Sequence, residues 1–223
     1  MSILEKIISV FAPHTCLGCG VENDLLLCAQ CRRGLPRVPS RCYHCRAVTD
    51  AYAVCGQCAG HTPLRQVIAY THHQGLAKEL LHRMKYERAQ AGLHEAAAMM
   101  AALTGHLPEG AVLVHIPTAT SRVRARGYDH ARVLARSLAR KSGLRHETFL
   151  SRAGQARQVG SNRSERLRQL DGAFRPVRTR LVRGQHIVLV DDVLTTGASL
   201  ETAARVLRRA GAARVSAIVF AQA

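Results

Sequence analysis

The sequence predicts an α/β domain with a mostly parallel sheet, preceded by a small cysteine-rich module. All eight cysteines lie within the first 58 of the 223 residues. Beyond them, strand-like apolar runs alternate with helix-like runs, an alternation typical of a parallel sheet covered by helices. Near the end, an apolar run closes on Asp191 and Asp192 and continues through small polar residues into a helix. We therefore expect a cysteine-rich module over residues 1–62 and an α/β domain over residues 63–223.

The cysteines form four C-x-x-C pairs, separated by eight, ten and nine residues. Such a pair lets one tight turn present two thiolates to a tetrahedral zinc ion, and a second pair completes the shell. Disulfides would require an oxidising compartment, and four tandem redox motifs would lack a thioredoxin-like context. We expect two structural zinc ions, with either sequential ligand sets or a crossed arrangement that joins the first pair to the third. The sequential sets are Cys16, Cys19, Cys28 and Cys31, then Cys42, Cys45, Cys55 and Cys58.

The hydrophobic pattern predicts the elements of the larger domain in order. Strands are expected at residues 65–73, 111–117, 146–152, 186–192 and 214–221, and helices at 75–84, 93–103, 129–143 and 199–211. In the first helix, apolar residues at helical spacing from Leu76 to Met84 indicate one buried face. Gly143 and Gly211 stand where the third and fourth helices should end, as glycine commonly does.

A parallel sheet binds its ligands at the carboxyl ends of its strands. Three segments should meet there: 116–129 and 151–174, which are rich in arginine, and 191–199. Thr195–Ser199 precede a helix, so their backbone N–H groups and hydroxyls suit a phosphate monoester. Asp191 and Asp192 are better suited to accept hydrogen bonds from sugar hydroxyls. The plainer alternative is a polar strand end followed by an ordinary N-cap at Ser199.

The formal charge of +17 is concentrated in one part of the chain. Between Arg122 and Arg183, sixteen Arg and one Lys face only four acidic residues. A solvated basic face is the simple explanation, but such a field also attracts polyphosphates and nucleic acids. With 4 % aromatic residues, a base-stacking platform is not evident. The sequence shows neither a signal peptide nor a membrane-spanning run, so a cytoplasmic location is expected.

The string from Ile187 to Ser199 resembles the phosphoribosyl pyrophosphate (PRPP) signature of type I phosphoribosyltransferases. It has four apolar residues, two acids, Val193 and Leu194, and then Thr-Thr-Gly-Ala-Ser. The resemblance implies that Asp191 and Asp192 are the catalytic pair holding the ribose hydroxyls, and that Mg²⁺ accompanies PRPP. It implies a 5′-phosphate site made of Thr195, Thr196, Gly197, Ala198 and Ser199. It also implies a pyrophosphate loop with Thr118 and with Arg122 or Arg126, and a lid over residues 151–174.

The order of the motifs along the chain points to one family among proteins with this signature. Four cysteine knuckles, "MKYERAQAG", "RVRARGYDHARVLAR", "QVGSNRSERLRQLDGAF" and the PRPP string are together similar to the ComF/GntX family. Its members are competence-associated proteins with a double zinc ribbon before a phosphoribosyltransferase-like domain. The resemblance implies DNA uptake in natural transformation, single-stranded DNA as a partner, and other competence or DNA-processing proteins as candidate partners. The chain departs from the family pattern at His115-Ile116-Pro117, at Asp129-His130 and at Gln169.

The sequence is compatible with three functions. A competence protein that binds PRPP and DNA is favoured, and a PRPP-dependent phosphoribosyltransferase with an unknown acceptor is the alternative. The helix and strand expected after Ser199 leave no room for a base-reading hood, so an ordinary salvage enzyme is not expected. A transcriptional regulator on the same fold would need a helix-turn-helix pattern, and the sequence contains none.

Overall fold

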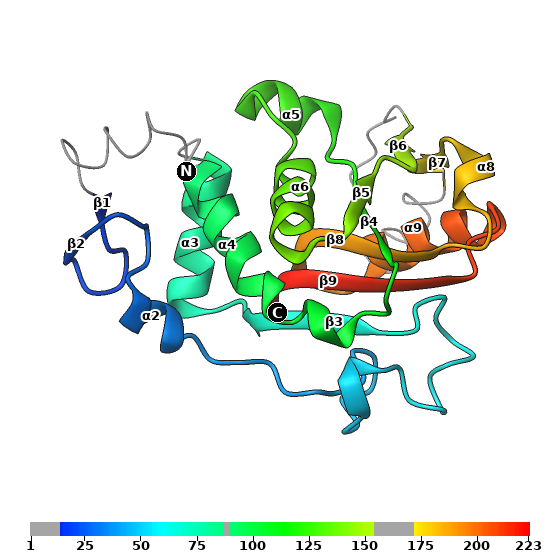
Figure 1. Cartoon of the computed structure of the whole chain (residues 1–223), viewed down its shortest axis with the longest axis horizontal. Helices are drawn as coiled ribbons and strands as arrows, with labels where there is room; N and C mark the ends of the chain where they lie inside the picture. The colour runs from blue at the N-terminus through cyan, green and yellow to red at the C-terminus, as the bar shows by residue number, and fades with distance from the viewer. Residues whose placement is uncertain (1–13, 87–89, 154–171) are drawn as a thin grey trace.

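The computed structural model describes residues 14–86, 90–153 and 172–223, and its centre is a five-stranded parallel sheet. In spatial order the strands are β3 (Val67–His72), β9 (Arg214–Gln222), β8 (His186–Leu194), β4 (Val112–His115) and β5 (Arg145–Glu147), as Figure 1 shows. Each neighbouring pair is parallel. The predicted α/β class with a parallel sheet is therefore confirmed.

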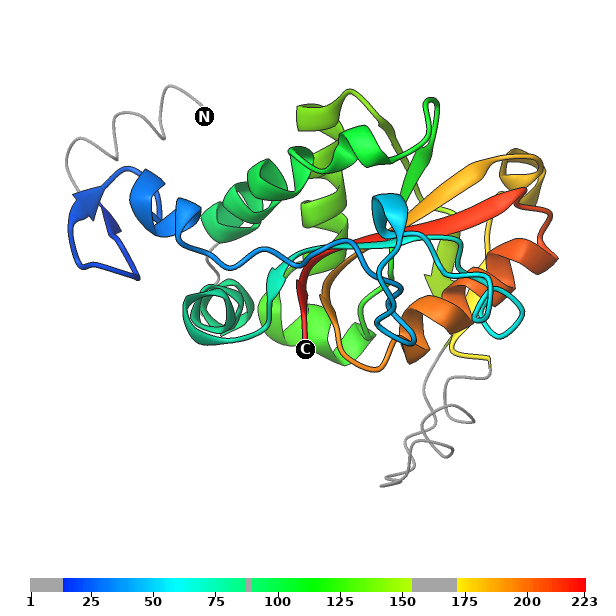
Figure 2. The ribbon, with the colours of Figure 1, turned by 90° about the horizontal axis from the view of Figure 1, so that it is seen from below.

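Helices cover both faces of this sheet. Helices α3 (Gly75–Tyr86), α4 (Gln90–Ala101) and α6 (His130–Ser142) contribute to one apolar core, and α9 (Ala198–Arg209) contributes to the other. Figure 2 shows α9 on the opposite side of the sheet from α4 and α6. All four expected helices are present, and α6 ends at Gly143 in the left-handed conformation, as its sequence predicted.

The inner part of β8, from Ile187 to Val190, is apolar at every position because both faces of the strand are buried there. Along β8, Val188 and Val190 belong to the core under α3, α4 and α6, which we call the first core. Ile187 and Leu189 belong to the core under α9, which we call the second core. Successive side chains of a strand point to opposite faces, so a doubly covered strand needs apolar residues at every position.

The cysteine-rich segment reaches both cores. Its first half contains a short antiparallel pair, β1 (His14–Thr15) with β2 (Glu22–Asn23), followed by α2 (Ala29–Arg33). Leu27 from this half is buried in the first core. Tyr43 from the second half is buried in the second core. The two halves therefore pack against different sides of the sheet.

One strand expectation was wrong. Residues 146–152 were expected as a single strand, but they divide between β5 and β6 (Leu150–Arg152). β6 pairs antiparallel with β7 (Phe174–Pro176) in a separate two-stranded sheet. Phe149, only 2 % exposed, inserts into the second core and takes the chain away from the edge of the main sheet.

A helix also occurs where a loop was expected. Residues 116–129 contain α5 (Thr120–Arg126), which ends at Gly127 with φ of 84°. Its stretch contains neither Gly nor Pro and includes the good helix formers Arg and Ala. The remaining short helices of the described residues are η1 (Asp50–Tyr52), η2 (Thr104–His106) and α8 (Thr179–Val182).

Some expectations fall outside the described residues. They include Gln169 and most of the expected lid, since residues 154–171 are not described. Among the helices that are described, none has the length and apolar character needed to cross a bilayer.

Candidate functional site

The two aspartates lie in the last part of β8, which continues to Leu194. Asp192 forms an ion pair with Lys85, at 2.7 Å between Oδ2 and Nζ. Asp191 Oδ1 accepts the backbone N–H of Asp192 at 2.9 Å. Burial and the charge of Asp192 raise the pKa of Asp191 to about 8, although the Asp192 N–H and Lys85 oppose this effect. The pair therefore tends to hold one proton at neutral pH, and it can both donate and accept hydrogen bonds.

Lys85 is a site residue to which the sequence assigned no role. The backbone carbonyl of its neighbour Met84 accepts hydrogen bonds from Tyr128 Oη at 3.1 Å and from His130 Nε2 at 2.7 Å. These bonds fasten the end of α3 to the start of α6 and so place Lys85 beside Asp192. The sequence signal was its place in the "MKYERAQAG" motif, directly after the buried Met84.

The segment Thr195–Ser199, which we call the phosphate loop, leads into α9. The helix begins at Ala198, and its N-cap is Gly197 with φ of 79°. The N-cap glycine has no side chain to form a capping hydrogen bond, and Ser199 is not the N-cap. Thr195 and Thr196 are exposed, and Thr196 Oγ1 approaches the Ala198 N–H at 3.4 Å. The first-turn N–H groups of a helix lack partners within the helix, so this end suits an anion.

The segment after β4 is braced by Asp129. One carboxylate oxygen of Asp129 accepts the Thr118 hydroxyl at 2.8 Å, and the other accepts the Thr118 N–H at 3.1 Å. Asp129 is also the N-cap of α6. Arg122 on α5 is exposed, whereas Arg126 is partly buried with Nη1 3.2 Å from His130 Nδ1. The sequence-predicted pyrophosphate residues are thus gathered on one braced turn and the helix that follows it.

Arg152 is a second residue that the sequence did not single out. Its Nη1 donates to the Pro117 carbonyl at 3.4 Å, and its buried Nε has no partner among the described residues. Burial and the charge of Arg122 lower the pKa of Arg152, while Asp191 raises it. Arg152 therefore lies between the turn after β4 and the aspartate pair.

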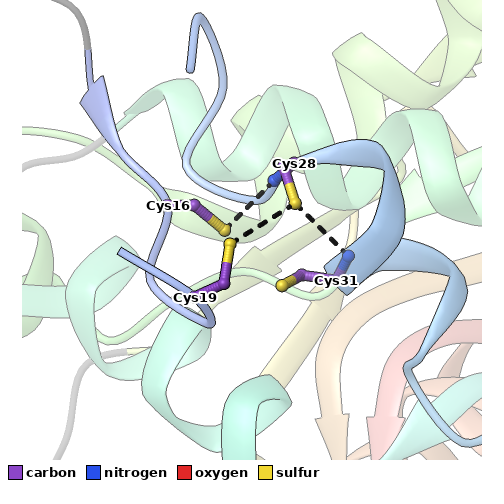
Figure 3. A group of neighbouring side chains, drawn as sticks. All are labelled: Cys16, Cys19, Cys28 and Cys31. Carbon is purple, nitrogen blue, oxygen red and sulfur yellow. Dashed lines mark hydrogen bonds between the residues drawn. The ribbon is translucent and has the colours of Figure 1, made fainter. Parts of the chain in front are cut away.

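The cysteines gather in two sequential clusters, Cys16, Cys19, Cys28 and Cys31, and then Cys42, Cys45, Cys55 and Cys58. In each, the four Sγ atoms lie within 4.8 Å of one another. Figure 3 shows the first cluster, in which Cys19 Sγ and Cys28 Sγ are 3.8 Å apart. A tetrahedral zinc site with Zn–S bonds of about 2.3 Å requires sulfurs about 3.8 Å apart. The clusters could therefore hold structural zinc, and the ligands group sequentially, not in the crossed arrangement.

Thiol acidity agrees with this geometry. Burial alone would raise the pKa of Cys16, but backbone N–H groups of Cys28, Cys19 and Gly18 lower it to about 6. Cys42 behaves in the same way in the second cluster, where its pKa is also about 6. Metal-binding cysteines act as thiolates, so a turn that stabilises one thiolate before metal binding favours a metal site.

Each cluster is tied to a different helix. In the first, the backbone N–H groups of Leu26 and Leu27 both donate to Glu95 of α4, Leu27 at 3.2 Å. In the second, Tyr43 Oη donates to Glu201 Oε1 of α9 at 2.8 Å. Neither glutamate was identified from the sequence, because each contact joins segments far apart in the chain.

Comparison with known proteins gives consistent matches. Residues 123–223 match the phosphoribosyl transferase domain family. The chain is 30 % identical over 213 residues to competence protein ComFC of Bacillus subtilis, covering 90 % of this chain and 85 % of that protein. It is 29 % identical over 199 residues to DNA utilization protein YhgH of Salmonella typhi, covering 85 % and 87 %. It is 27 % identical over 196 residues to competence protein F of Haemophilus influenzae, covering 83 % and 85 %. With these matches and its parallel sheet beside two four-cysteine clusters, the chain belongs to the ComF family of phosphoribosyltransferase-like proteins.

Proposed function

We propose that this protein binds PRPP at the carboxyl ends of β4 and β8 and acts in DNA uptake during natural transformation. The observation that carries the proposal is the aspartate pair of β8 followed, a few residues later, by the glycine N-cap and the N-terminus of α9. Asp191 and Asp192 would hold the ribose 2′- and 3′-hydroxyls. The backbone and hydroxyls of the phosphate loop would bind the 5′-phosphate.

The pyrophosphate end of the ligand would lie against the turn after β4. Thr118 on this turn and Arg122 and Arg126 on α5 are the contacts that the family resemblance implies. Arg152 and Lys85 extend this set, because both place a partly buried cation near the aspartates. Charges of both signs lie at the carboxyl ends of the strands. They suit a ligand with hydroxyls at one end and a pyrophosphate at the other.

Mg²⁺ is expected to enter with PRPP. The aspartate oxygens and the oxygens of the ligand are the hard donors that Mg²⁺ prefers. When bound, the ion would supply positive charge that neutralises the pyrophosphate. The role of the chain is to orient the sugar between Asp191, Asp192 and the phosphate loop.

The domain division supports the same function. We propose that residues 1–62 form a double zinc ribbon with a structural role, since four thiolates leave no open metal position for chemistry. Residues 63–223 would form the PRPP-binding domain. The exposed arginines of α5 and α6 lie beside the proposed site and would contact single-stranded DNA. The names of the relatives, which refer to competence and DNA utilization, support this assignment.

A double substitution tests the PRPP site. Asp191→Ala with Asp192→Ala should abolish PRPP binding in isothermal titration calorimetry with Mg²⁺, because the ribose hydroxyls lose both acceptors. The zinc content should stay unchanged. Glu109→Ala is the matched control. Glu109 is an exposed carboxylate just before β4, so it lies at the amino end of the strand and away from the proposed site. PRPP affinity that survives the double substitution would contradict the proposal.

The alternative is a phosphoribosyltransferase that acts on an acceptor of unknown class. Three features support a transferase, namely the phosphate loop, the aspartate pair and the braced turn. Incubation with PRPP, Mg²⁺ and candidate acceptors separates the two functions. Acceptor-dependent release of pyrophosphate would show catalysis, whereas PRPP binding without release would identify a binding protein.

A further inference from the structure

Tyr43 belongs to the second cysteine cluster but faces the phosphate loop. It follows Cys42 directly in the Cys42–Cys45 knuckle, and its side chain is only 8 % exposed. It is part of the second core, which also contains Leu200 and Leu194 on either side of the phosphate loop. A residue in a metal-binding knuckle is thus buried against the end of the proposed PRPP site.

The contacts of Tyr43 join three segments. Its hydroxyl donates to Glu201 Oε1 at 2.8 Å and is hydrogen-bonded to the hydroxyl of Thr62. Thr62 in turn accepts the backbone N–H of Leu64 at 3.2 Å. With the Thr62 hydroxyl donating to Tyr43, every group in this chain of bonds is satisfied.

The ring of Tyr43 lies against the residue that starts α9. A Cβ added to Gly197 would come within 3.3 Å of Tyr43 Cε2, so the ring and the loop backbone are in close contact. Glu201 lies in the first turn of the same helix, and its N–H bonds to the Gly197 carbonyl at 2.9 Å. Tyr43 therefore contacts the phosphate loop at two points, through its ring at Gly197 and through its hydroxyl at Glu201.

The first cluster has no comparable contact among the described residues. The residue equivalent to Tyr43 in the Cys16–Cys19 knuckle is Leu17, which packs against the first core. The described part of the chain thus places one cluster beside α3 and α4 and the other beneath the phosphate loop.

We propose that Tyr43 is a positioning residue for the phosphate loop, and that the second cysteine cluster contributes to ligand binding by holding Tyr43 in place. The inference rests on the proposed function, in which the loop binds the 5′-phosphate. Tyr43 does not touch the ligand. It fixes the orientation of the first-turn N–H groups of α9 through Gly197 and Glu201.

The first test compares two fragments of PRPP as probes. Ribose 5-phosphate should use the phosphate loop, whereas inorganic pyrophosphate should use the turn after β4. Tyr43→Phe keeps the ring and removes the hydroxyl, so it should weaken ribose 5-phosphate binding about five-fold, which corresponds to one net hydrogen bond. Tyr43→Ala should weaken it further. Neither variant should change pyrophosphate affinity or the content of two zinc ions.

Tyr52→Phe is the matched control. Tyr52 lies in the same cysteine-rich segment, and its hydroxyl donates to the Val38 carbonyl at 3.3 Å, away from α9. Its loss should leave both affinities unchanged. A general loss of stability would weaken the binding of ribose 5-phosphate and of pyrophosphate together. Such a result would overturn the positioning role. Unchanged ribose 5-phosphate affinity in both Tyr43 variants would also overturn it.

The second test needs no ligand. Amide hydrogen exchange should accelerate over residues 194–201 in Tyr43→Ala and not in Tyr52→Phe, while residues 112–115 in β4 keep their wild-type rates. If wild-type protein bound neither ribose 5-phosphate nor PRPP, the proposed function would fail, and exchange would still decide whether Tyr43 orders the loop. Wild-type exchange rates over 194–201 in Tyr43→Ala would refute the inference.

Discussion

Asp191 combines a partly buried carboxylate with a like charge beside it, a combination that lowers the stability of the folded state. Burial and Asp192 raise its pKa from the usual 3.8 to about 8, so the folded protein retains a proton that the unfolded chain releases. Perturbed acids of this kind cluster at functional sites. The Lys85–Asp192 ion pair limits the repulsion by neutralising one member of the pair.

This arrangement predicts a pH dependence of stability. Between about pH 4 and pH 8 the folded state binds more protons than the unfolded state, so the free energy of unfolding should fall as pH rises. Asp191→Asn cannot ionise and should flatten that fall. Near pH 8 the variant should be more stable than wild type by about 1 kcal/mol or more, and near pH 4 the difference should vanish. Urea unfolding at both pH values measures this, and parallel curves for the two proteins would contradict it.

At the scale of elements, how much the sequence predicts depends on how local the signal is. The phosphate loop and both cysteine clusters are contiguous motifs, and so they could be located without a structure. The main strands and helices followed from hydrophobic period. The exceptions include residues 146–152, where the burial of Phe149 overrides the strand pattern, and residues 120–126, which form α5 where a loop was expected. Tyr43 and Glu201 are 158 residues apart and could not be paired from the sequence. The same holds for Lys85 and Arg152, whose roles arise only when the sheet brings loops together.

The link between the first cluster and α4 gives a prediction at this scale. Glu95, 5 % exposed, accepts the N–H groups of Leu26 and Leu27 just before Cys28. Glu95→Ala would leave two buried donors unpaired and should reduce the free energy of unfolding by about 2–4 kcal/mol. One of the two metal ions should then pass to a chelator faster than the other.

Glu79→Ala is the control for this prediction. Glu79 lies on α3 with its side chain 51 % exposed, and it pairs with the exposed Arg83 one turn along the helix. Its removal should change stability by less than about 0.5 kcal/mol. Urea unfolding and the kinetics of zinc release measure both effects. Equal losses in the two variants would mean that Glu95 does not support the first cluster.

At the scale of the whole molecule, the cysteine-rich segment connects the two faces of the sheet. Its first cluster packs beside the start of α3, near Leu76, and its second lies beside the phosphate loop at Gly197. The two candidate metal clusters therefore lie on different faces of the sheet, and the second is the one beside the proposed site. The exposed arginines of α5 and α6, which we call the basic surface, also act at the scale of the whole molecule. Their charge acts over distances longer than any single contact.

The basic surface predicts salt-dependent DNA binding. Arg132 and Arg136 are exposed on α6 and are spaced by four residues, so they lie on one face of the helix near the proposed site. Affinity for single-stranded DNA should fall steeply between about 50 and 200 mM salt, because each neutralised phosphate releases counterions. Fluorescence anisotropy with a labelled oligonucleotide measures the slope of log affinity against log salt. Flat binding over this range would argue against a role with DNA.

A matched pair of variants locates the DNA contact. Arg132→Gln with Arg136→Gln should reduce the slope by about 1 to 2, since each phosphate contact on a single strand contributes about 0.7. The control variant is Arg209→Gln with Arg214→Gln, which removes the same charge. These exposed residues lie where α9 ends and β9 begins, at the opposite end of the strands from the proposed site. This control should leave the slope nearly unchanged, whereas equal reductions would show that only net charge matters. A lower slope in the α6 variant with unchanged PRPP affinity would place DNA on α6, beside the sugar-phosphate site and separate from it.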